Sequence, residues 1–107
     1  MFEKTIMSSS KEYLNFVLDE LSNLDNISYR PMMGEYIIYY DGVVIGGIYD
    51  DRFLVKKTPT VIEMIPNPTL ELPYEGGKEM VLVDVDDKEL LNILIPLIAN
   101  DISNKIK

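Results

Sequence analysis

The sequence predicts an α+β domain with two layers, in the order α-β(3)-α-β(2)-α. Its sheet is expected to have five mostly antiparallel strands, with the helices on one face. Three observations predict this class. Asp41-Gly42 stands between two alternating apolar runs, which is the strongest short-range signal for a β-hairpin. Residues near both ends of the chain carry helical apolar periodicity, and the chain's 107 residues suit one domain.

Composition excludes several classes of function. Ten Lys and Arg against 18 Asp and Glu give a net charge of -8, so phosphate backbones repel the chain and no direct nucleic-acid binding is expected. The chain has no cysteine, which excludes disulfides, thiol nucleophiles and Cys-ligated zinc. It has no histidine either, so the commonest general base and metal ligand is missing. We expect no metal and no cofactor.

The domain is expected to span residues 9–107, after a flexible lead-in at residues 1–8. No apolar stretch is long enough for a signal peptide or for the ~18–20 residues that span a bilayer. We therefore expect a cytoplasmic protein that makes no membrane contact.

The first helix is predicted over residues 10–24. Ser9 with Glu12 three residues later fits a capping box at its start. Residues 27–32 then run extended into the hairpins. The apolar positions at helical spacing are Leu14, Val17, Leu18, Leu21 and Leu24.

A short helix and two strands are predicted after the hairpins. Thr58-Pro59 combines an N-cap with proline at the first helical position, and Pro66 ends that helix. Residues 69–74 and 80–85 read as the fourth and fifth strands.

The last helix is predicted over residues 87–104, capped by Asp86 with Glu89. Pro96 lies inside it and is expected to kink or break it. The helix is apolar nearly all round, and such a helix must be buried on every side. In a domain of this size that predicts a homodimer, with contacts from Leu91, Ile95 and Ile98.

Two hairpin turns set the predicted register of residues 30–56. Tyr40 should face Val43 across Asp41-Gly42, and Ile48 should face Phe53 across the weaker turn at Asp50-Asp51. The predicted core face carries Ile37, Tyr39, Val44, Gly46, Ile48, Phe53 and Val55. The predicted outer face carries Tyr36, Ile38, Tyr40, Val43, Ile45, Tyr49, Arg52, Leu54 and Lys56.

The predicted outer face is less polar than a solvated face usually is. A protein partner is one explanation, because Tyr and Arg are enriched at the centres of protein interfaces. Coverage within the same chain is another. A base-stacking sheet is a third, although it would need a positive field. The candidate protein-binding residues are Arg30, Met32, Met33, Tyr36, Ile38, Tyr40, Tyr49, Arg52 and Lys56.

Two groups of residues could carry other chemistry. Glu35, with Tyr36 and Arg52, would suit a small-ligand binder or an enzyme if the glutamate were buried. The acidic cluster of Asp84, Asp86 and Asp87 and the pair Asp50-Asp51 could bind a hard cation, but a helix cap and a turn explain them as well. No residue is predicted to be catalytic.

The stretch RPMMGEYIIYYDG, followed by YDDRFLVK, resembles the N-terminal domain of the TfoX (Sxy) competence regulators. Met33 and Glu35 depart from the family pattern, which has an aromatic residue and a second glycine there. The matching residues are Arg30, Pro31, Met32, Gly34, Tyr36, Tyr39, Asp41, Gly42, Asp50, Asp51, Leu54 and Lys56.

The resemblance implies a secretion-chaperone-like topology and no established catalysis. The longer TfoX regulators carry a further C-terminal domain and act with the cAMP receptor protein at competence promoters. We expect a stand-alone, single-domain member. Its predicted role is non-enzymatic regulation through protein–protein interaction, with a partner that the sequence does not name.

Overall fold

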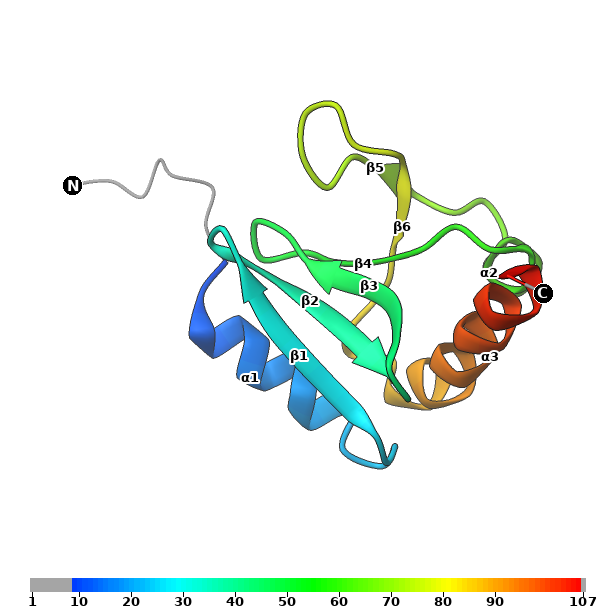
Figure 1. Cartoon of the computed structure of the whole chain (residues 1–107), viewed down its shortest axis with the longest axis horizontal. Helices are drawn as coiled ribbons and strands as arrows, with labels where there is room; N and C mark the ends of the chain where they lie inside the picture. Colours follow the sequence, from blue (N-terminus) through cyan, green and yellow to red (C-terminus); the bar gives the residue numbers. More distant parts are fainter. Residues whose placement is uncertain (1–8, 107) are drawn as a thin grey trace.

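The computed structural model describes residues 9–106 and contains one open, six-stranded sheet with three helices (Figure 1). The predicted lead-in at residues 1–8 lies outside the described residues. The strand order is β1-β2-β3-β4-β6-β5, and every neighbouring pair is antiparallel. The elements are α1 (Lys11–Glu20), β1 (Ile27–Met32), β2 (Glu35–Tyr40), β3 (Val43–Ile48), β4 (Phe53–Val55), α2 (Pro59–Met64), β5 (Leu70–Glu71), β6 (Met80–Leu82) and α3 (Lys88–Ile106).

The α+β class is confirmed, with six strands rather than five. The extra strand arises because Met33-Gly34 is a turn, so that Met32 pairs with Glu35. Both turn residues have positive φ, 51° and 85°. Asp41-Gly42 and Asp50-Asp51 share that conformation. Two positive φ values in a two-residue loop are typical of the hairpin turn that matches strand twist, so β1 to β4 form a continuous meander.

Both predicted capping residues were one position early. Ser10, not Ser9, caps α1, because its Oγ accepts a hydrogen bond from the Tyr13 backbone N–H at 3.0 Å. At the start of α3, Asp87 accepts from the Leu90 N–H at 3.1 Å. The residue before each cap lies outside the helix.

A β-bulge between β2 and β3 places the residues of this hairpin that precede it on the opposite face of the sheet from the predicted one. Tyr40 pairs with Val43, as predicted, but Ile38 pairs with Gly46 instead of Ile45. Ile45 is therefore an extra residue without a partner. Because side chains alternate along a strand, one extra residue moves those before it to the opposite face.

The face assignment was therefore wrong before the bulge and confirmed after it. The true core-side residues before the bulge are Tyr36, Ile38, Tyr40, Val43 and Ile45, whereas Ile37, Tyr39 and Val44 lie on the outer side. After the bulge, Ile48, Phe53 and Val55 lie in the core and Leu54 on the outer side, as predicted.

All three helices pack on one face of the sheet, as predicted. Figure 1 shows α1 beneath the β1–β2 hairpin and α2 beside α3 at the opposite end. Each fully buried aliphatic or aromatic side chain contributes about 1.5–3 kcal/mol of transfer free energy, so this shared core dominates the stability. Its fully buried residues from the helices are Leu14, Val17, Val61, Leu91, Leu94, Ile95 and Ile98, together with Leu21 at the C-cap of α1.

A carboxylate of α3 fixes the start of α2. Thr58 holds the predicted N-cap position, but its side chain makes no capping hydrogen bond. Asp101 instead accepts from the Thr60 backbone N–H at 2.9 Å. Hydrogen bonds from Thr60 lower the pKa of Asp101 below its usual value. The buried Thr58 hydroxyl lies near enough to add to this lowering, although it is not positioned for a hydrogen bond of its own.

Helix α3 runs without a break through Pro96, so the predicted break is absent. Proline removes the backbone hydrogen bond to the Asn92 carbonyl. The Asn92 side chain anchors this part of the helix, because its amide donates to the Lys88 carbonyl at 2.6 Å and to the Glu20 carbonyl at 3.4 Å. Between residues 9 and 106, no helix is long and apolar enough to cross a membrane.

Candidate functional site

Part of the outer face of the sheet is covered by the chain itself. A second, smaller apolar cluster lies there, formed by Tyr49, Leu54 and Met80 with Ile37 and Leu82 against them. The Tyr49 ring lies over Gly47, where an added Cβ would come within 2.8 Å of the ring. Burial, followed by the proximity of Tyr74 and Glu35, raises the pKa of Tyr49. This tyrosine is therefore a neutral packing residue at physiological pH.

The structure separates the predicted outer-face tyrosines. Tyr36 and Tyr40 pack against the helix-side core, and Ile38 is fully buried in it. Tyr49 is buried on the other side of the sheet. A single tyrosine-rich binding face therefore does not form.

The Arg52 side chain binds the edge strand β5 and the residue that follows it. Its guanidinium Nη1 contacts Glu71 Oε1 at 2.5 Å, and its Nη2 donates to the Leu72 carbonyl at 3.2 Å. Its Nε donates to the Tyr49 carbonyl at 3.0 Å. These contacts tie the second hairpin to the segment that covers the outer face.

Glu35 belongs to a hydrogen-bonded junction between three parts of the chain. Its Oε1 accepts from the Ser9 hydroxyl at 2.8 Å and from the Asp50 backbone N–H at 3.0 Å. The Ser9 Oγ also accepts from the Asp51 N–H at 3.1 Å, and the Ser9 N–H donates to the Gly34 carbonyl at 2.9 Å. The junction ties the start of α1 to two hairpin turns, which gives Glu35 a structural task.

The sequence did not reveal this role of Ser9. Capping-box spacing assigned it to the helix cap instead, and no local pattern links it to turns 26 and 42 residues away. The Glu35, Tyr36 and Arg52 side chains do not share one pocket, because Tyr36 points to the helix side of the sheet.

Comparison with known proteins decides the family. The family model of the TfoX N-terminal domain matches residues 19–89, from the end of α1 to the start of α3. The chain belongs to the TfoX N-terminal domain family. It is also 33% identical over 78 residues to an uncharacterized 12.7 kDa protein in the trpE 5′ region of Spirochaeta aurantia. That match covers 73% of this chain and 68% of the relative.

Among residues 9–106 of this TfoX N-terminal domain, the most exposed large apolar side chain lies in the β1–β2 turn. The Met33 side chain is 95% exposed, and the neighbouring Met32 is 44% exposed. We call these two residues the methionine tip. Arg30 lies on the same strand, with its guanidinium 5.9 Å from the centre of the Tyr39 ring. Among the predicted binding residues, Arg30, Met32, Met33 and Lys56 are therefore exposed.

The predicted dimer residues lie inside the TfoX N-terminal domain. Leu91, Ile95 and Ile98 are fully buried against the sheet of the same chain. Over residues 88–104 of α3, the exposed large apolar residues are Ile93 and Leu97, at 56% and 38% exposure. A second copy would therefore meet these two rather than the predicted three.

The acidic pairs of this TfoX N-terminal domain act in local structure. Asp50-Asp51 forms a turn, and Asp87 caps α3. From residue 9 to residue 106, no group of three or more Asp and Glu side chains is arranged to hold a metal ion.

Proposed function

We propose that this chain is a non-enzymatic interaction domain that binds a protein partner through its methionine tip, in a regulatory role in the cytoplasm. Membership of the TfoX N-terminal domain family supports the regulatory role. Competence control is the form that this role takes in the longer TfoX proteins.

One observation carries the proposal: Met33 is both strained and exposed. A bulky residue at φ 51° is unfavourable, because the left-handed region costs roughly 1–2 kcal/mol for residues with a Cβ. At 95% exposure, the Met33 side chain offers little packing energy in return. Local strain without a folding benefit indicates a functional position. Methionine is also a flexible, polarizable residue that adapts to partner surfaces.

The strand beside the tip favours contact through side chains. Strand β1 is an edge strand, and edge strands can pair with a foreign strand. Pro31 lies in it and cannot donate a backbone hydrogen bond, which blunts strand pairing. The exposed side chains at the tip are therefore the binding elements that we propose.

The contacts of Glu35 and Arg52 support a role without catalysis. Both charged groups are engaged in the fold, Glu35 with Ser9 and Asp50, and Arg52 with Glu71. A general acid or base needs a free approach to its substrate.

Affinity capture from the source cells tests the proposal. Met33→Asp should lose the captured protein and keep the circular dichroism spectrum of the folded chain. Asn100→Asp places the same charge on an exposed position of α3 and should capture as the unchanged chain does. Equal capture by both variants would refute the proposal.

Self-association is a second candidate, favoured by the exposed apolar pair on α3. Ile93 and Leu97 are four residues apart and therefore share one helix face. Sedimentation equilibrium at micromolar concentration should give a dimer mass, and Leu97→Lys should give a monomer mass. A monomer mass for the unchanged chain would exclude the dimer.

A further inference from the structure

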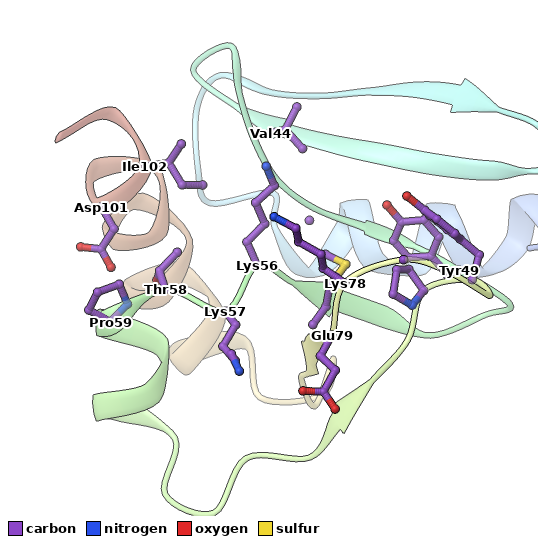
Figure 2. A pocket seen from close by; sticks show the side chains of 16 residues that line it. Val44, Tyr49, Lys56, Lys57, Thr58, Pro59, Lys78, Glu79, Asp101 and Ile102 are labelled. Carbon is purple, nitrogen blue, oxygen red and sulfur yellow. The ribbon is translucent and has the colours of Figure 1, made fainter. Parts of the chain in front are cut away.

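A cleft on the outer side of the sheet lies apart from the methionine tip. It has a volume of about 910 Å³ and lies between the sheet, the loop before β6 and the end of α3 (Figure 2). Ligand pockets usually measure about 300–1,000 Å³, so the cleft suits a small organic molecule. Its walls include Val44 of β3, Tyr49, Pro73, Tyr74 and Ile102.

The cleft concentrates positive charge in an acidic protein. Lys56, Lys57 and Lys78 line it, and they are three of the ten Lys and Arg residues in a chain of net charge -8. Within residues 9–106, the one ion pair joins Arg52 to Glu71. None of the three lysines of the cleft therefore has a carboxylate of these residues within salt-bridge distance. Figure 2 shows Lys56 and Lys78 extending toward Val44, whereas Lys57 and Glu79 point the other way. The ammonium groups of Lys56 and Lys78 therefore face the cleft without a carboxylate partner among the described residues.

The end of the cleft beside α2 and α3 is unfavourable for an anion. Asp101 lines it and accepts the hydrogen bond from Thr60. The lowered pKa of Asp101 keeps it negatively charged. A bound anionic group is consequently directed away from α2 and toward Lys56 and Lys78.

An aromatic wall that includes Tyr49 lies on the side of Lys56 and Lys78 that is opposite to Asp101 (Figure 2). The rings of Tyr49 and Tyr74 meet edge to face, with centroids 6.1 Å apart. Tyr74 is 56% exposed, so much of its ring is open to a second packing partner. Gly77 leaves room for this ring, because a Cβ at that position would come within 2.9 Å of Tyr74 Cε1.

We propose that this cleft binds a small organic anion. Its carboxylate or phosphate group is held by Lys56 and Lys78, and its apolar or aromatic body packs against Tyr74. Charge-assisted hydrogen bonds supply the attraction to the anion, and the aromatic wall selects against inorganic ions. The site is independent of the methionine tip and of any protein partner.

Titrations followed by backbone amide NMR test the proposal with four probes. Phenyl phosphate and phenylacetate carry both features, inorganic phosphate carries the charge alone, and benzyl alcohol carries the ring alone. At least one aromatic anion should give saturable shifts at Lys57, Gly76 and Gly77, and the other two probes should not saturate. Whichever of phenyl phosphate and phenylacetate binds more tightly shows whether the cleft prefers a phosphate or a carboxylate group.

Three variants locate the binding. Lys56→Gln and Lys78→Gln should each weaken the aromatic anion by roughly tenfold, as expected for the loss of a charge-assisted hydrogen bond. Lys11→Gln removes the same charge from the exposed start of α1 and should bind within about twofold of the unchanged chain. Absence of saturable shifts with both aromatic anions would overturn the proposal, as would binding by both cleft variants that is as tight as binding by the unchanged chain.

Discussion

Gly46→Ala should strongly destabilise the domain, because Gly46 lets β3 and β4 approach closely beside the bulge. A Cβ built at this position would lie 2.2 Å from the Leu54 carbonyl oxygen and 2.8 Å from the Val55 Cα. Both atoms belong to the backbone, so no side-chain rotation relieves the overlap. The two strands must separate by about 1 Å to reach ordinary contact distance.

The magnitude follows from what that separation breaks. The hydrogen bond from the Lys56 N–H to the Ile45 carbonyl is 2.9 Å long and would lengthen beyond bonding range. Overpacking costs about 1–3 kcal/mol, and each lost hydrogen bond costs about 1 kcal/mol. A total of about 2–4 kcal/mol should lower the melting temperature by roughly 8–16 °C.

Thermal unfolding followed by far-ultraviolet circular dichroism measures this change, with Gly42→Ala as the matched control. A Cβ at Gly42 meets nothing within 4 Å, and its φ of +80° alone costs about 1–2 kcal/mol. The control should therefore melt roughly 4–8 °C below the unchanged chain. A Gly46→Ala variant as stable as the unchanged chain would refute the bulge geometry and the face assignment that depends on it.

Four further results are expected. Met33→Gly should leave the free energy of unfolding unchanged or raise it by up to about 1 kcal/mol in urea titrations. The relief of backbone strain offsets the greater conformational entropy that glycine gives to the unfolded chain. A clear loss of stability would show that Met33 supports the fold. Arg52→Gln should cost only about 1 kcal/mol, because the pair with Glu71 is part-exposed, but should speed amide hydrogen exchange near β5; unchanged exchange would contradict the anchoring role. The pKa of Asp101 is lowered from 3.8 in the folded state, so its carboxylate stabilises the fold above that value. Asp101→Asn should therefore lower the melting temperature at pH 7, and the difference from the unchanged chain should close as the pH falls below 3.8. A difference in melting temperature that stays constant with pH would exclude the ionic contribution. Fluorescence anisotropy with labelled duplex DNA at low salt should show no binding, and salt-sensitive binding would contradict the inference from the net charge of -8.

Local sequence signals predicted the turns and helices well because each depends on neighbouring residues. Asp41-Gly42 and Asp50-Asp51 form the expected hairpins, and Thr58-Pro59 begins the expected helix. Met33-Gly34 was missed, because methionine is not a residue that favours a left-handed turn. Gly34 was the available signal for that turn.

The bulge and the site depended on distant contacts that the sequence does not display. Ile45 lies in an unbroken run of apolar residues, so alternation alone did not show where a residue was inserted. Gly46-Gly47 was the one hint, because glycine inside a strand often marks a bulge or a close approach. The buried state of Leu91, Ile95 and Ile98 likewise depends on how α3 lies on the sheet.

Photo-crosslinking in the source cells tests whether the methionine tip contacts a protein partner. A photoreactive phenylalanine analogue at position 33 is compared with the same analogue at the exposed position 100 of α3. We expect a discrete protein adduct from position 33 that position 100 does not give and that excess unmodified chain competes away. No adduct from position 33, or the same adducts from both positions, would contradict it.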